Sequence, residues 1–338
     1  MNATAKGGAA STAPSARGWT AAAAGHGHAA VLYDDTDVLL TATTPFLEDG
    51  LRAGDLVVLA CPPEVAATIT GPLGERARHV ESEPRICLLD TRAPDAFGAT
   101  RQVLQRAPAA RSGRVRLVGQ VQFGCEPATY REGLRYEIAA NAVLAGAPMS
   151  VLCLLDATVL PAPLLSLAAA AHPQLVAGDG LVDNRDFREP SSFLHSLPVP
   201  HEPVEDTEPL LAVEGATVLS ELRRRLRTAL ATAVPDPDQQ DDLVLAVSEV
   251  AANAFRHGRP PVSARLWADD CRLVCTVTDS GRGYDDPLAG FQPAHGDDLA
   301  HGGMGLWLAR KLWDSVDLVN DGPGLTVRLA TALCAAAA

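Results

Sequence analysis

Three short motifs follow one another within about sixty residues near the C-terminal end of this chain. They read Glu249-Val-Ala-Ala-Asn253-Ala-Phe-Arg-His257, then Asp279-Ser-Gly281-Arg-Gly283, then Gly302-Gly303-Met304-Gly305-Leu306. Glu249, Asn253 and His257 recur every fourth residue, so on a helix they share one slowly turning polar stripe. A carboxylate and an amide on that stripe can meet a metal-bound triphosphate. The motifs therefore predict an ATP pocket.

The residue types suggest a role for each position in this pocket. Mg²⁺ prefers oxygen ligands and retains waters, so the side-chain oxygen of Asn253 is the predicted metal ligand. Glu249, one turn earlier, is the predicted catalytic residue that orients or deprotonates an attacking hydroxyl group. Asp279 is expected to accept a hydrogen bond from the adenine amino group. Gly281 and Gly283 would let the backbone approach the base without a Cβ in the way.

The third motif is expected to open a helix whose N-terminal amides face the phosphates. The predicted nucleotide-binding set also contains Gly303, Met304, Gly305, Leu306 and His257. His257 stands at the predicted helix end, where capping of carbonyl groups is an alternative role. The segment 285–301 between the second and third motifs is rich in Asp, Gly, Pro and His and is predicted to be a mobile lid.

Each motif alone is a weak signal. Glu and Asn four residues apart, an Asp-x-Gly-x-Gly turn and a glycine-rich helix start all occur in unrelated proteins. Their order, spacing and placement on a helix, after a strand and before a second helix are together much more specific. Three unrelated loops in a generic α/β domain are therefore the disfavoured interpretation.

Composition excludes several other classes. The chain has 338 residues, enough for two domains, and a net charge of −13 that argues against nucleic acid as a direct partner. Pro161 and Pro163 interrupt the long Ala/Leu tract at 151–171, so no membrane-spanning segment is expected. Seven cysteines, an odd number that lies mostly in apolar runs, are interpreted as small core residues in a reducing cytoplasm.

A change in composition divides the chain. The segment 186–212 contains four prolines between Glu189 and Pro203 and is predicted to be a linker. Residues 1–24 are expected to form a disordered tail. Between them, in the domain 25–185, apolar runs alternate with helical patterns, which predicts βαβ units and a mostly parallel sheet covered on both faces. The expected strands are 29–33, 55–60, 86–90, 115–119 and 150–155, and the expected helices are about 36–53, 94–108 and 129–146.

The second domain, 213–330, begins with an arginine-rich helix at about 217–233 whose charged face is expected to be exposed. The helix at 238–257 carries the first motif, and its core contacts are assigned to Leu243, Leu245, Val247 and Val250. Two strand-like runs follow, and the second one delivers Asp279 at its end.

The first domain offers weaker candidates. His26 and His28 could begin a metal site, but the sequence places no third ligand, and a flexible polar lead-in is the favoured interpretation. The helix at 129–146 carries Arg131, Glu132, Arg135, Tyr136, Glu137 and Asn141, which are interpreted as a solvated or salt-bridged face. Ligands of a doubly wound sheet are expected beyond the carboxyl ends of its strands.

With these motifs in view, residues 213–330 resemble the GHKL ATPase superfamily, which includes gyrase, histidine kinases and MutL. The N box corresponds to Glu249, Asn253 and His257, the G1 box to Asp279, Gly281 and Gly283, and the G2 box to Gly303 and Gly305. The resemblance implies a Bergerat-type two-layer α/β sandwich. The compact run Leu-Ala-Val-Ser-Glu-Val-Ala-Ala-Asn-Ala-Phe-Arg-His-Gly is similar to the anti-sigma-factor serine kinases of the RsbW and SpoIIAB type. That similarity implies Mg-ATP, a sigma factor, and an antagonist protein of the STAS type phosphorylated on serine or threonine.

Residues 25–185 are similar to the MEDS sensory domain that precedes such kinases in actinobacterial regulators of the RsbA type. The similarity rests on His28-Ala-Ala-Val-Leu-Tyr33, on Phe46-Leu-Glu-Asp-Gly-Leu51 with Gly54, and on Arg135-Tyr-Glu-Ile-Ala-Ala-Asn141. It implies a signal-sensing domain in a cytoplasmic regulator of transcription that acts in a stress response.

Three functions stay open at this point. The favoured one is a serine/threonine kinase that acts on the antagonist, and the second is a module that sequesters the sigma factor without phosphate transfer. A sensor histidine kinase is disfavoured, because His195 and His201 lie in the proline-rich segment and His172 precedes Pro173. The oligomeric state is open as well, with a homodimer as one option.

Overall fold

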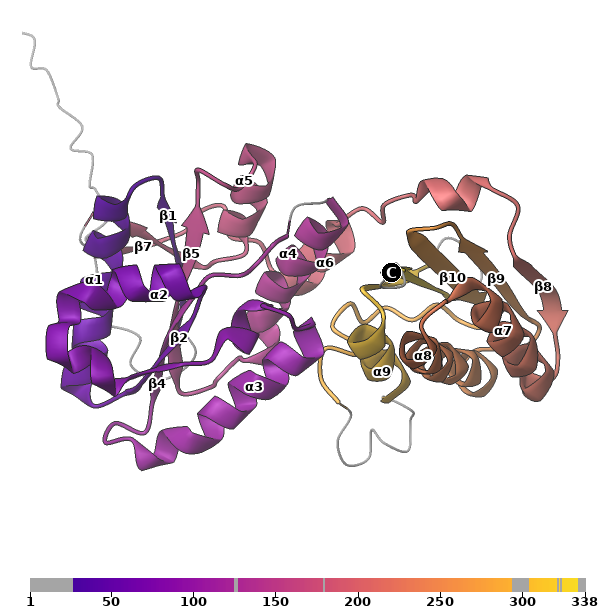
Figure 1. Ribbon diagram of the computed structural model, residues 1–338, viewed down its shortest axis with the longest axis horizontal. Helices are drawn as coiled ribbons and strands as arrows, with labels where there is room; N and C mark the ends of the chain where they lie inside the picture. Colours follow the sequence, from indigo (N-terminus) through magenta and orange to yellow (C-terminus); the bar gives the residue numbers. More distant parts are fainter. Residues whose placement is uncertain are drawn as a thin grey trace, which may run out of the picture.

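The computed structural model describes residues 27–124, 127–178, 180–293, 304–320, 322 and 324–333. Two α/β domains lie side by side, and a strand-poor segment connects them along one edge (Figure 1). The predicted tail at 1–24 lies outside the described residues. Among the helices that the structure describes, none combines the length and the apolar character needed to cross a membrane.

The first domain is built on a sheet of order β3-β2-β4-β5-β1-β6-β7. All described neighbours in it are parallel except β6 and β7, so the predicted mostly parallel sheet is confirmed. Its strands are β1 Gly27–Tyr33, β2 Leu56–Ala60, β3 Val80–Ser82, β4 Val115–Gly119, β5 Met149–Asp156, β6 Gln174–Ala177 and β7 Gly180–Asp183. Its helices are α1 Thr36–Ala53, α2 Pro63–Thr70, α3 Ala93–Arg106, α4 Pro127–Val143 and α5 Ala162–Ala170.

Local sequence explains where these elements begin and end. The Asp35 side chain accepts a hydrogen bond of 2.8 Å from the Val38 amide, which satisfies a free N–H group in the first turn of α1. Gly54 ends the same helix with φ 82°, in the left-handed region that glycine adopts without a steric penalty. The inner strands β2 and β4 are buried along nearly their whole length, as expected when helices cover both faces of a parallel sheet.

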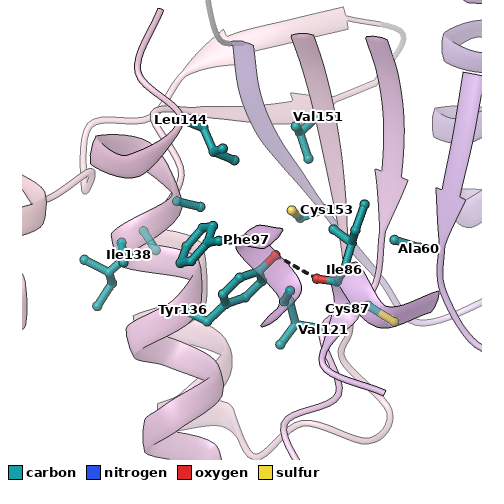
Figure 2. Close-up of a cluster of buried hydrophobic side chains, with 14 of the residues drawn as sticks. Ala60, Ile86, Cys87, Phe97, Val121, Tyr136, Ile138, Leu144, Val151 and Cys153 are labelled. Atoms are coloured by element: carbon teal, nitrogen blue, oxygen red, sulfur yellow. Dashed lines mark hydrogen bonds between the residues drawn. The ribbon is translucent and has the colours of Figure 1, made fainter. Parts of the chain in front are cut away.

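One core of this domain lies between the sheet and helices α3 and α4 (Figure 2). The rings of Phe97 and Tyr136 pack with their centroids 4.8 Å apart. The Tyr136 hydroxyl donates a 2.7 Å hydrogen bond to the Ile86 carbonyl, so the buried phenol keeps a polar partner.

The prediction of a strand at 86–90 is wrong. Pro84–Cys87 forms a short 3₁₀ helix, and Leu88 and Asp90 take positive φ values of 64° and 49°. Pro84 lacks the N–H group that a strand would use, and the edge strand β3 forms earlier, at Val80–Ser82. Ile86 is buried as its apolar character suggests, but in a turn rather than in the sheet.

The second domain is a two-layer α/β sandwich, as predicted. Its antiparallel sheet has the order β11-β12-β10-β9-β8, with strands β8 Leu211–Ala216, β9 Val262–Ala268, β10 Arg272–Thr278, β11 Ser315–Val319 and β12 Thr326–Ala332. The helices α7 Leu219–Ala233, α8 Pro237–Arg256 and α9 Met304–Leu312 cover one face of it (Figure 1).

The apolar stripe of α8 differs at one position from the prediction. Leu243, Val247 and Val250 are buried in the core, but Leu245 is 48% exposed. Two residues along a helix correspond to about 200°, so Leu245 and Leu243 cannot face the same core.

The proline-rich segment docks on both domains. It contains the helix α6 Pro190–Ser196, whose Phe193 is fully buried in the core of the first domain. Further along, Val204 packs with Trp267 on the outer face of the second sheet, and Glu205 forms a 2.6 Å ion pair with Arg328. A few apolar residues therefore attach this segment to the two domains, although its composition is otherwise typical of a linker.

Several charged residues lie in the contact between the domains. Asp317 of β11 is 2% exposed and lies 2.7 Å from Arg131, 3.2 Å from Arg135 and 3.5 Å from Arg328. Burial alone would raise the pKa of this carboxyl, but the neighbouring arginines outweigh it and hold the pKa below its usual range. The sequence predicted that the charged face of α4 is solvated or salt-bridged. The structure shows salt bridges on this face, and Arg135 is buried rather than exposed to solvent.

Replacing Asp317 by Asn is expected to destabilise the protein by about 3–5 kcal/mol at neutral pH, because buried guanidinium groups lose their carboxylate. Folding lowers the pKa of Asp317, so its contribution is complete above the unfolded pKa of about 3.9 and is lost as the pH falls through the folded value. Urea unfolding of both proteins from about pH 7 to about pH 3 should show the difference shrinking on acidification.

The matched control is Asp270→Asn in the exposed turn between β9 and β10, which should change the unfolding free energy by less than about 0.5 kcal/mol. A difference between wild type and Asp317→Asn that stays constant over the whole pH range would contradict the assignment.

Candidate functional site

Helix α8 carries the first motif. Its start is fixed by Asp236, whose side chain accepts a hydrogen bond from the Asp238 amide, and by Pro237 in the first turn. Near its other end, Glu249 keeps a 35% exposed side chain and Asn253 is half-buried. His257 ends the helix: its amide donates a 2.8 Å hydrogen bond to the Asn253 carbonyl, and its side chain is exposed.

The first turn of α9 packs directly on this stripe. A Cβ atom at Gly305 would lie 2.5 Å from Asn253 Nδ2 and 3.4 Å from Glu249 Cβ, so only glycine fits there without displacing Asn253. The first and third motifs therefore meet. The free N–H groups at the start of α9 lie beside Asn253 as a consequence. Met304 and Leu306 flank Gly305 and are half-buried, whereas Gly303 lies outside the described residues.

The second motif places a buried carboxylate next to α8. Asp279 is 6% exposed, and its Oδ1 accepts a 2.7 Å hydrogen bond from the Gly281 amide. A Cβ at Gly281 would lie 2.9 Å from that oxygen, and a Cβ at Gly258 would lie 2.5 Å from Asp279 Oδ2. Gly324 is packed even more tightly against the Asp279 backbone. The carboxylate is thus surrounded by glycine backbone.

Gly258 and Gly324 were not among the predicted site residues. Gly258 directly follows the first motif, and Gly324 precedes β12, so their role becomes visible only when the chain brings both to Asp279. Asn320 is a third such residue. Its side chain bonds to the amide and the carbonyl of Tyr284 at 3.2 and 3.1 Å and packs against Gly283, which fixes the end of the second motif.

Arg223 of α7 is a fourth residue that sequence reasoning missed. Its Nη2 lies 3.6 Å from Glu249 Oε1 and 3.2 Å from the Ser248 carbonyl. Both charged side chains are more than a third exposed, so this pair contributes little to stability. Its effect is positional, because the backbone hydrogen bond holds the guanidinium beside the Glu249 carboxylate. The signal in the sequence was the arginine-rich helix, read as a plain exposed face.

The described part of the predicted lid is anchored rather than mobile. Within 285–293, Phe291 is 1% exposed and lies in the core of the first domain, edge-on to Phe97 with centroids 6.1 Å apart. The guanidinium of Arg310 lies over the same ring at 4.4 Å. Burial of the single aromatic side chain of Phe291 therefore holds this segment in place, although its composition is typical of a loop. Residues 294–301 of the predicted lid lie outside the described residues.

The same segment touches the third motif. A Cβ at Gly290 would lie 2.7 Å from the Leu306 backbone, so the two backbones are in close contact. Arg310, one turn further along α9 than Leu306, donates to the Ala289 carbonyl at 2.8 Å and to the Val316 carbonyl at 3.1 Å. Burial and the nearby Arg135 lower the pKa of Arg310 to about 9. These contacts join the core of the first domain to the start of α9.

Comparison with known proteins shows which domain families the two parts of the chain match. Residues 215–331 match the family described as a histidine kinase-like ATPase domain, and residues 27–173 match MEDS, the methanogen/methylotroph, DcmR sensory domain. The chain joins a MEDS domain to a histidine kinase-like ATPase domain. Both sequence resemblances are thereby confirmed.

The ATPase domain also resembles curated proteins. It is 35% identical over 103 residues to the serine-protein kinase RsbW of Bacillus velezensis and to that of Bacillus subtilis. The RsbW of Bacillus licheniformis is 35% identical over 104 residues. Each match covers 27% of this chain and 64% of the relative, so the chain spans less than two thirds of the length of these relatives.

The residues of the ATPase domain are chemically suited to hold Mg-ATP. Asn253 offers an amide oxygen of the hard type that Mg²⁺ prefers, and it stands beside a helix start suited to phosphate. Gly305 leaves open the space over Asn253 that a Cβ would fill. Asp279 presents a buried carboxylate framed by backbone, and a carboxylate can accept a hydrogen bond from an adenine amino group.

Gly305→Ala tests this arrangement directly. The added Cβ must push the Asn253 side chain aside, so we expect ATP affinity, measured by isothermal titration calorimetry with Mg²⁺, to fall by about tenfold or more. Gly322→Ala is the control, since a Cβ there meets nothing within 4 Å. Equal ATP affinity of the two variants, with circular dichroism showing both folded, would argue against a nucleotide site at Asn253.

Proposed function

We propose that this protein is an ATP-dependent regulator of a sigma factor and that it phosphorylates a serine or threonine of a STAS-type antagonist. The observation that carries the proposal is the position of Glu249. It stands one turn before Asn253, next to Gly305, with a side chain exposed enough to reach a hydroxyl group of another protein. The names of the RsbW relatives, serine-protein kinases, support the same reaction class.

In this proposal each residue has one task. Asn253 would ligate Mg²⁺, which would supply neutralisation of phosphate charge, and Asp279 would accept a hydrogen bond from the adenine amino group. Glu249 takes the proton from the antagonist's hydroxyl group as the hydroxyl oxygen bonds to the γ-phosphorus. The bond from that phosphorus to the oxygen bridging to the β-phosphate breaks, and ADP leaves with both electrons of the bond.

Other features of the chain fit such a regulator. The net charge of −13 suits protein partners better than direct contact with nucleic acid. The sigma factor, the antagonist, the cytoplasmic location and the role in a stress response belong to this proposal. Sequestration of the sigma factor without phosphate transfer is the alternative that uses the same ATP site.

A sensor histidine kinase fits less well. His195 lies on α6, which has only seven residues, and it pairs with Asp285 at 2.5 Å. His172 is fully buried in the first domain. Among the described residues, neither lies on a long helix that could form a dimerising hairpin, which supports a phosphate acceptor on a separate protein.

Glu249→Gln separates the kinase from the sequestering module. Loss of the base should lower transfer of phosphate from ATP to the antagonist by roughly a hundredfold or more, whereas ATP affinity should change by less than about threefold. Radiolabel transfer and calorimetry measure the two effects. Glu221→Gln on the exposed side of α7 is the control. ATP binding without transfer by the wild-type protein would leave only sequestration.

We further propose that the MEDS domain controls the ATP site through Phe291 rather than through the proline-rich segment alone. The contacts are continuous: Phe97 and Arg135 touch Phe291, Gly290 touches Leu306, and the adjoining Gly305 touches Asn253. A change in the core of the MEDS domain can therefore move the first turn of α9 by direct packing.

Phe291→Ala in the full-length protein is expected to loosen this connection. Hydrogen exchange in α9 should become faster and ATP affinity should change, because the anchor of the preceding segment is gone. Phe46→Ala removes an equally buried ring from the opposite core of the MEDS domain, and a comparable loss of stability is expected from it. If both variants speed exchange in α9 alike, or neither does, Phe291 is no specific link.

A further inference from the structure

Four side chains with metal-binding chemistry meet inside the MEDS domain, away from the ATP site. They are His28 of β1, Glu137 of α4, Cys153 of β5 and His172, which precedes β6. None is more than 5% exposed, and their ligand atoms all lie within 4.8 Å of one another. The prediction of a flexible lead-in at His28 is wrong, because the partners that make it a buried strand residue come from distant parts of the chain.

Four of the six distances within the cluster match the edges of a coordination tetrahedron, and the other two are no longer than 4.8 Å. His28 Nε2 lies 3.3 Å from Cys153 Sγ and 3.4 Å from Glu137 Oε2. His172 Nε2 lies 3.5 Å, and Cys153 Sγ 3.6 Å, from the same carboxylate oxygen. Zinc bonds of about 2.0–2.3 Å at tetrahedral angles separate ligand atoms by about 3.3–3.8 Å. Direct N–H···O hydrogen bonds would bring the histidines to about 2.7–3.2 Å from the carboxylate.

The outer nitrogens of both histidines are held by acceptors. His172 Nδ1 lies 2.8 Å from the Ala168 carbonyl, which can only accept, so Nδ1 carries the proton. His28 Nδ1 lies 3.0 Å from Asn141 Oδ1, and the amide nitrogen of Asn141 donates to the Ala171 carbonyl at 2.8 Å, which orients that amide. With the Nδ1 atoms held in this way, the Nε2 atoms of both imidazoles point into the cluster, as those of metal-binding histidines do.

Without a cation this arrangement is unsatisfied. His172 Nε2 and Glu137 Oε1 are buried and make no hydrogen bond to any described residue. Each such group costs about 1–3 kcal/mol. An ion pair at 3.5 Å between a doubly protonated His172 and Glu137 would still leave Glu137 Oε1 without a partner.

We propose that His28, Glu137, Cys153 and His172 bind one divalent transition-metal ion, Zn²⁺ or Fe²⁺, in the MEDS domain. Two imidazoles, one thiolate and one carboxylate suit these borderline ions, whereas Mg²⁺ and Ca²⁺ prefer oxygen ligands alone. A cavity of about 30 Å³, bordered by His28, Glu137 and Cys153 and otherwise mainly apolar, lies beside the cluster. It has room for one or two water-sized molecules next to the ion.

The test uses the full-length protein without an affinity tag. Elemental analysis after purification should find about one zinc or iron per chain, and which of the two is found decides between them. After removal of the metal with a chelator, added Co²⁺ should give tetrahedral d–d bands and a thiolate-to-cobalt charge-transfer band. Cys153→Ser should lose the charge-transfer band. Cys87→Ser, a buried cysteine that borders the same cavity, should keep it.

Two further measurements keep the proposal open to refutation if Cys153→Ser folds poorly. Asn141→Ala should keep the cobalt spectrum but lower Co²⁺ affinity by about 10–100-fold, because it releases the outer nitrogen of His28. Added Zn²⁺ should raise the melting temperature of the metal-free wild type but not that of His172→Gln. Absence of bound metal together with no cobalt spectrum, or a charge-transfer band unchanged in Cys153→Ser, would overturn the proposal.

Discussion

The carboxylate of Asp317 is the interaction on which the arrangement of the two domains depends. It lies at the end of the second sheet, yet two of its three arginine partners come from α4 of the MEDS domain. Taking these charges out of water is costly, and an apolar contact of the same size would be at least as stable. What the ionic contact provides is orientation, because it is satisfied in only one relative placement of the two domains.

Phe291 adds an apolar contact to this ionic one. It comes from the ATPase part of the chain but is buried in the core of the MEDS domain, where Arg135 and Arg310 both lie against its ring. Arg135 therefore serves both the charged and the apolar parts of the interface. A disturbance at either part can reach the other through it.

The geometry of the proposed ATP site was largely predictable because its signals are local. Glu249 and Asn253 share a helix, Asp279 ends a strand and Gly305 opens a helix, so order and spacing were enough to bring the three motifs together. Arg223, Gly258 and Gly324 were missed because their roles arise from tertiary contacts. Leu245 shows a simpler failure, in which an apolar residue was assigned to the core against the helical period.

The metal cluster shows why the MEDS domain was harder to interpret. Its four residues lie on β1, on α4, on β5 and just before β6, far apart in the sequence. They show no short spacing of the kind that marks a zinc finger. From the sequence, Cys153 was interpreted as a small core residue and Glu137 as part of a solvated or salt-bridged helix face. Each interpretation was reasonable for that residue alone. Phe291 and Phe193 were missed for the opposite reason, since each is one apolar residue in a segment that otherwise has the composition of a loop.

Helix α4 has a consequence for how such proteins can be assembled. Arg135 faces the ATPase domain and Glu137 faces the interior of the MEDS domain, and two residues on a helix lie about 200° apart. One added or deleted residue between them would turn one side chain away from its partner by about 100°. The MEDS domain is therefore not a freely interchangeable module: a sensory domain grafted from another regulator would have to bring a helix with both faces in the same register.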